Sequence, residues 1–133
     1  MNPEALSPAR IAASLPDLWF PRIIGEVDDA YVKVARLKGT FVWHRHDDAD
    51  ELFFVLRGRL RIDFESAPDD SGQIASVELG EGEMTIVPKG MRHCPVADEE
   101  CHVLLFERKS TLHTGDVVTE ITRSIEEQRG QPD

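Results

Sequence analysis

Residues 39–58 read GTFVWHRHDDADELFFVLRG, and this stretch decides the fold. It places His44 and His46 one residue apart, after a short run of aromatic and β-branched residues, and Glu51 shortly after them. Side chains on a β-strand alternate between its two faces, so the two histidines are predicted to project from the same face. Imidazole nitrogens and a carboxylate oxygen are together suitable ligands for a divalent transition metal. The stretch therefore predicts a metal site built on a β-strand.

A second stretch, residues 82–97, reads GEMTIVPKGMRHCPVA and contributes a third histidine, His93. Pro88 and Gly90 mark a tight turn between one strand and the next. We expect this turn to bring His93 toward the other candidate ligands from a different strand.

Together the two stretches resemble the two motifs of the cupin superfamily, G-x5-H-x-H-x3,4-E-x6-G and G-x5-P-x-G-x2-H-x3-N. The whole chain is similar to small single-domain cupins of the mannose-6-phosphate isomerase-like type. The resemblance implies an all-β fold, the double-stranded β-helix or jelly roll. It also implies that His44, His46, Glu51 and His93 are the metal ligands.

The chain departs from the cupin pattern at two places. Only four residues separate Gly39 from His44, where the pattern has five, but the spacing among the ligands is untouched. Ala97 stands where the pattern has asparagine. Because alanine cannot hydrogen-bond through its side chain, support for the ligands at this position is either missing or comes from other groups.

Turn residues punctuate the rest of the chain at short intervals. Ser7 as N-cap and Pro8 as first helical residue predict a short helix that ends before Pro16. Strands are predicted at 20–27, 31–38, 41–46, 51–56, 59–65, 74–79, 84–87, 93–96 and 101–108, the last two as a hairpin. Many short strands of this kind indicate an all-β sandwich or barrel. We expect an N-terminal arm or helix over 1–19, the barrel over 20–110 and a partly disordered C-terminal extension over 111–133, with a frayed tail from Ser124.

The predicted hairpin would place His102 on the same side as His93. His102 is therefore a candidate catalytic residue for proton transfer or substrate contact, and a structural, hydrogen-bonded histidine is the alternative. His113 is predicted to lie on the surface. The side chains expected to face inward near the metal are Val42, Phe53, Leu60, Ile62, Met84, Ile86, Leu104 and Phe106.

The amino-acid composition limits which binding partners and which cellular compartment we expect for this protein. The 15 basic and 25 acidic residues give a net charge of −10, which argues against nucleic acid or an anionic membrane surface as a partner. No stretch approaches the roughly 20 apolar residues of a membrane span, and residues 1–10 lack an apolar signal core. Cys94 and Cys101 are predicted to be thiols in a reducing compartment. We expect a cytoplasmic protein.

The ligand set predicts one divalent transition metal, among Mn, Fe, Co, Ni, Cu and Zn. Four protein ligands leave about two positions of an octahedron open for a small oxygen-bearing molecule, or for that molecule and dioxygen. The first hypothesis is a metal-dependent enzyme of isomerase or dioxygenase type. The alternative is a non-catalytic module that binds or senses a small ligand. A homodimer is expected, with Tyr31 and Trp43 in the subunit contact.

Overall fold

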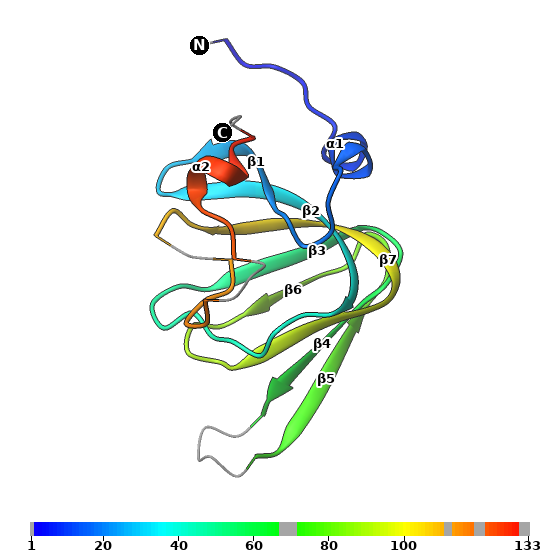
Figure 1. Cartoon of the computed structure of the whole chain (residues 1–133), viewed down its shortest axis with the longest axis vertical. Helices are drawn as coiled ribbons and strands as arrows, with labels where there is room; N and C mark the ends of the chain where they lie inside the picture. The colour runs from blue at the N-terminus through cyan, green and yellow to red at the C-terminus, as the bar shows by residue number, and fades with distance from the viewer. Residues whose placement is uncertain (1, 67–71, 111–112, 119–121, 131–133) are drawn as a thin grey trace.

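A computed structural model describes residues 2–66, 72–110, 113–118 and 122–130. Most of this chain is β-strand, folded into two facing layers (Figure 1). The elements in chain order are α1 (Pro8–Ser14), β1 (Arg22–Val27), β2 (Ala30–Thr40), β3 (Glu51–Arg57), β4 (Leu60–Glu65), β5 (Ile74–Leu79), β6 (Met84–Val87), β7 (His93–Arg108) and α2 (Ile125–Gln128). The predicted all-β jelly roll with a short N-terminal helix is confirmed.

Strand β7 ties the two layers together, because its two halves pair with different strands. Its first half pairs with β4, which pairs in turn with β5, whereas its second half lies between β2 and β3. The larger layer has the order β1-β2-β7-β3-β6. The predicted hairpin over 93–108 is therefore wrong. The polar residues 98–100, which resemble a turn in the sequence, are exposed where one continuous strand of 16 residues passes between the layers.

The core lies between the two layers, and strand alternation decides which side chains enter it. Its buried members are Ala35, Leu37, Phe53, Val55, Leu60, Ile62, Leu79, Val87, Ala97, Cys101, Val103 and Leu105. The inward positions predicted at Phe53, Leu60 and Ile62 are confirmed.

Four of the predicted inward positions are wrong, those at Met84, Ile86, Leu104 and Phe106. Met84 is 49% exposed, Ile86 is 53% exposed and Phe106 is 37% exposed. Val103 and Leu105 occupy the inner face of β7, so Leu104 and Phe106 fall on its outer face. The error on β7 comes from the assumed hairpin. A reversal of the chain after residue 97 would have placed Leu104 and Phe106, instead of Val103 and Leu105, on the inner face.

The turn between β3 and β4 requires glycine. Gly58 has a φ of +86°, and a Cβ there would lie 3.0 Å from the Glu100 carbonyl oxygen and 3.1 Å from the Cys101 Cβ. Any larger residue would combine backbone strain with a clash against the bend of β7. The second glycine of the first motif thus lets the β3–β4 turn approach β7 closely where that strand passes between the layers.

Both helices carry N-caps. The Ser7 hydroxyl accepts a hydrogen bond from the Arg10 N–H, which confirms the predicted cap of α1. The expectation of a frayed tail is wrong for residues 124–130, because Ser124 and Glu127 form a capping box and Gln128 is buried. Residues 111–112, 119–121 and 131–133 of the predicted extension lie outside the described residues. In the part of the chain that the structure describes, neither helix is long and apolar enough to cross a bilayer.

Candidate metal centre

The segment 41–46 carries two of the candidate ligands. It forms one isolated β-bridge, between His44 and His93, in place of the predicted strand. On its other side it contacts the C-terminal segment: the Asp116 N–H donates to the Arg45 carbonyl at 3.0 Å, and the Arg45 N–H donates to Asp116 Oδ1 at 3.0 Å. Contacts on both sides fix the direction of the side chains that project from this segment.

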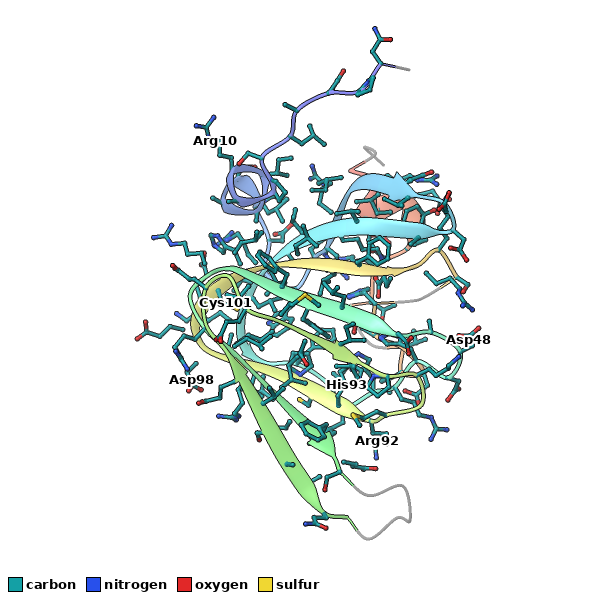
Figure 2. All side chains as sticks on the ribbon, turned by 180° about the vertical axis from the view of Figure 1, so that it is seen from behind. Arg10, Asp48, Arg92, His93, Asp98 and Cys101 are labelled. Atoms are coloured by element: carbon teal, nitrogen blue, oxygen red, sulfur yellow. The ribbon has the colours of Figure 1, made fainter. Side chains whose placement is uncertain are left out.

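The structure brings all four predicted ligands together. His44, His46, Glu51 and His93 are each at most 6% exposed, and one ligand atom from each lies within 4.8 Å of the others. Glu51 Oε1 is 3.2 Å from His46 Nε2 and 3.4 Å from His93 Nε2. Donors held about 2.1 Å from one cation at a right angle are about 3 Å apart, so this spacing fits a shared metal ion. Figure 2 shows His93 inside the β-shell.

Main-chain carbonyls orient two of the imidazoles. His44 Nδ1 lies 2.9 Å from the Val42 carbonyl oxygen, and His93 Nδ1 lies 2.9 Å from the Met91 carbonyl oxygen. A carbonyl can only accept, so each Nδ1 carries the proton and each Nε2 keeps a lone pair for a metal. Support for these ligands therefore comes from the backbone, while Ala97 is packed in the core.

The protonation states of the cluster suit a cation. Burial and the neighbouring His93 lower the pKa of His44 to about 4. Burial alone would raise the pKa of Glu51, but its contacts with the imidazoles of His46 and His93 outweigh burial and hold that pKa well below its usual range. Burial also lowers the pKa of His46, yet its hydrogen bond to Glu51 raises the net value. The site thus offers a carboxylate and a neutral imidazole, the forms that coordinate metals.

A buried ion pair adjoins the cluster, and the sequence analysis missed it. Lys33 Nζ lies 2.7 Å from Glu107 Oε1, and both side chains are fully buried. Glu107 is the cross-strand partner of Glu51. Burial and the Glu51 charge raise the pKa of Glu107 to about 8. The side-chain carbonyl of Gln128, from α2, accepts a hydrogen bond from Lys33.

A cavity of about 30 Å³ lies beside the cluster. Its lining residues are Trp19, Pro21, Ala35, Leu37, Phe41, His44, Glu51, Phe53, Pro95, Leu105 and His113. The Trp19 and Phe41 rings stack with centroids 4.6 Å apart. A water molecule needs roughly 10–15 Å³ on this measure, so anything larger than a few atoms requires a wall to move. The cavity has apolar walls and the candidate ligands His44 and Glu51 on one side.

His113 is among these lining residues, so its predicted surface position is wrong. It is 5% exposed, and its ring centroid lies 6.0 Å from that of Phe41. The pairing of Asp116 with Arg45 carries the C-terminal segment to this end of the sandwich. Local sequence gave no periodic signal for that contact.

The structure does not bring His102 to the cluster. Its Nε2 lies 2.8 Å from a Glu100 carboxylate oxygen, and that carboxylate also pairs with Arg36. The neighbouring Cys101 lies toward the end of the sandwich opposite Asp48 (Figure 2). The role proposed for His102 depended on the hairpin, and with β7 continuous its side chain lies on the outer face of the strand. This geometry matches the alternative reading, a structural histidine.

The fold and the site together define a jelly-roll protein with three histidines and one glutamate converging inside the β-shell. Residues 31–107 match the family described as Cupin domain (Cupin_2), and the chain belongs to that family.

Three similar proteins illustrate the relationship. The uncharacterized protein YdbB of Bacillus subtilis is 39% identical over 70 residues, which are 53% of this chain and 56% of that protein, so the match spans about half of its length. A cupin-2 domain containing protein from Shewanella frigidimarina is 35% identical, with a TM-score of 0.69 over 77% of this chain and 93% of that one. Hydroquinone 1,2-dioxygenase from Sphingomonas sp. TTNP3, with 4-hydroxybenzoate bound, is 18% identical, with a TM-score of 0.60 over 77% of this chain and 71% of that one. This last likeness is one of fold.

Proposed function

We propose that this protein binds one divalent transition metal through His44, His46, Glu51 and His93 and acts on a small molecule at that metal. The observation that carries the proposal is the convergence of four buried ligand atoms within 4.8 Å of one another. When bound, such a metal polarises a carbonyl, enol or carboxylate oxygen, or activates dioxygen. Mn, Fe, Co, Ni, Cu and Zn all suit the ligand types.

The surrounding residues prepare the site for such chemistry. Carbonyl contacts hold the imidazoles of His44 and His93 with Nε2 toward the cluster. The stacked rings of Trp19 and Phe41 belong to the mostly apolar walls of the adjoining cavity, and an apolar surrounding strengthens electrostatic interactions inside it. We favour an enzyme of dioxygenase or isomerase type, with mannose-6-phosphate-type isomerisation among the candidates. The likeness to hydroquinone 1,2-dioxygenase makes para-diphenols a first substrate panel.

The alternative function is a non-catalytic module that binds or senses a small ligand. The mostly apolar lining of the cavity favours this reading, because small-ligand sites are lined in this way whether or not they are catalytic. Product formation from any panel compound, compared under air and under nitrogen, distinguishes the two functions. Metal-dependent binding without product in either atmosphere would support the module.

The metal site is tested by reconstituting the full chain with each metal and measuring metal content and melting temperature. A ligand that binds the folded state at about 1,000 times its Kd adds about 4 kcal/mol of stability, so the melting temperature should rise. His46→Ala should abolish both the bound metal and this rise. His102→Ala is the matched control, since it also removes a buried histidine but lies outside the cluster, and it should retain both. Equal responses of His46→Ala and wild type to metal would refute the ligand assignment.

Two further parts of this proposal concern compartment and assembly. Cys94 and Cys101 are unpaired and buried, which fits a reducing compartment, and we place the protein in the cytoplasm. We also propose a homodimer. Tyr31 is 5% exposed in the single chain and its hydroxyl accepts a hydrogen bond from Arg129 of the same chain, so we propose that other residues supply most of the subunit contact.

A further inference from the structure

The C-terminal segment lies against the segment that carries the first two histidines, at one end of the sandwich (Figure 1). Gly115 makes the closest approach. Its φ is +61°, and a Cβ there would overlap the Arg45 carbonyl oxygen and lie 2.9 Å from His44 Cδ2. Asp116 bonds to Arg45 in both directions and fixes the register. The contact is close enough to hold a neighbouring side chain in a defined place at the edge of the cavity.

That side chain is His113, two residues before Gly115. It lines the same cavity as His44 and Glu51. The Arg123 main-chain N–H donates to His113 Nε2 at 2.8 Å. A ring nitrogen that accepts a hydrogen bond carries no proton, so the neutral imidazole has its proton on Nδ1. Burial lowers the pKa of His113 to about 4, which agrees with a neutral ring near pH 7.

The other walls of the cavity offer no free side-chain donor among the described residues that line it. Trp19 has an indole N–H, but it donates to the Lys38 carbonyl at 2.8 Å. His44 and Glu51 belong to the candidate metal cluster, and the remaining walls are apolar. A small molecule seated there would therefore find its polar partner outside the cluster at His113.

We propose that His113 contacts the bound small molecule, its Nδ1–H donating a hydrogen bond to the negatively charged atom that the molecule places on the metal. This rests on the proposed metal site. Because the Arg123 amide occupies Nε2, Nδ1–H is the donor that this lining residue has left for a guest molecule. A fixed neutral donor in an apolar surrounding favours an anionic acceptor strongly, because little water competes for it. His113 thus selects ligands that bind the metal through an anionic atom able to accept a hydrogen bond.

Azide is a suitable probe, because it is a small anion that binds metals and accepts hydrogen bonds. The full chain is reconstituted with Co(II), and azide is titrated against the visible absorption of the cobalt. His113→Phe removes the donor and keeps a ring, whereas His113→Asn keeps an amide N–H near the position of Nδ1. The cobalt content should be the same in all three proteins. The Kd for azide should rise about ten- to hundred-fold in His113→Phe and stay within about threefold of wild type in His113→Asn.

Azide binding by cobalt-loaded His113→Phe at the wild-type Kd would overturn this inference while leaving the metal site intact. Failure of the wild-type chain to bind cobalt would overturn the metal site and the inference with it. A second measurement needs no variant. In the zinc-loaded wild type, azide should shift the His113 Nδ1–H signal in an imidazole ¹H–¹⁵N spectrum, and an unchanged signal in the azide-bound protein would also overturn the proposal.

Discussion

His44 and His93 exchange two main-chain hydrogen bonds, 3.0 Å from the His44 N–H to the His93 carbonyl and 2.8 Å in the reverse direction. This reciprocal pair joins two candidate ligands from distant parts of the sequence without help from a cation. We therefore expect the metal-free protein to be folded. Removal of metal with a chelator should lower the melting temperature but preserve a cooperative transition in far-UV circular dichroism. A metal-free chain without such a transition would show that the cation itself organises the fold.

The buried pair Lys33–Glu107 is expected to be costly to break. Lys33→Met removes the cation beside Glu107, whose raised pKa then keeps its carboxyl group protonated near pH 7. The loss is that of a buried hydrogen-bond partner, and it should lower the free energy of unfolding by about 1–3 kcal/mol. The double variant Lys33→Met, Glu107→Gln should recover part of that loss. Urea unfolding measures both. The control is Arg59→Met, which removes an ion pair whose side chains are 71% and 66% exposed and should cost at most about 1 kcal/mol. Equal costs for the two single variants would contradict a special role for burial.

Gly115→Ala should destabilise the C-terminal segment. The added Cβ meets the Arg45 carbonyl oxygen at a φ of +61°, so both backbone strain and a clash oppose it. Gly82→Ala is the matched control, because Gly82 has a φ of +81° with nothing within 4 Å of the added Cβ. We expect Gly115→Ala to lower the melting temperature more than Gly82→Ala does. The reverse order would mean that the segment is held more loosely than the structure shows.

Stability should depend on pH through His113. Its pKa is lowered from an ordinary value of 6.5 to about 4 by burial. Between these values the unfolded chain binds a proton at this site and the folded chain does not. The free energy of unfolding should therefore fall with falling pH in that window, by up to about 1.4 kcal/mol per pH unit. His113→Asn should show a shallower decline than wild type in urea unfolding at several pH values, and parallel curves would count against a neutral buried ring.

The proposed homodimer is expected to use the outer face of β3, β6 and β7. Leu52 pairs with both Ile86 and Phe106 on this face, where Ile86 is 53% and Phe106 37% exposed. Apolar side chains gathered on an exposed sheet face mark an interaction surface. Sedimentation should give twice the 15.0 kDa of one chain, and Ile86→Lys should shift it toward the monomer. Val118→Lys is the control, because Val118 is an apolar residue that is 78% exposed but lies outside this face, and it should leave the mass unchanged. A wild-type monomer would refute the dimer.

The metal cluster could be predicted from the sequence because its ligands lie in two short stretches whose local geometry is fixed. The segment 41–46 brings the rings of His44 and His46 together, and a turn after Pro88 returns the chain so that His93 lies beside His44. Most strands were likewise predicted within a few residues, since turn residues bound them. These features depend on neighbours in sequence, which is where single-sequence reasoning is strongest.

The predictions from the sequence were wrong where contacts between distant parts of the chain decide the structure. Period-two alternation places Lys33 in phase with the buried Ala35, and Glu107 in phase with the buried Leu105, so both were detectable in principle. The assumed hairpin displaced the phase on β7 and hid Glu107. His113 had no such signal, because its position follows from the contact of Asp116 with Arg45 on a segment that is distant in sequence.

The passage of β7 through both layers limits how a guest molecule can enter. The two layers share β7 as one unbroken strand, which is hydrogen-bonded to β2, β3 and β4. Separating the layers along β7 to admit a molecule would break some of these hydrogen bonds. Trp19 offers another route, because it lines the cavity and is only half-buried. A rotation of its side chain is a local change, so entry into the cavity can depend on this one residue while the β-strands around it keep their places.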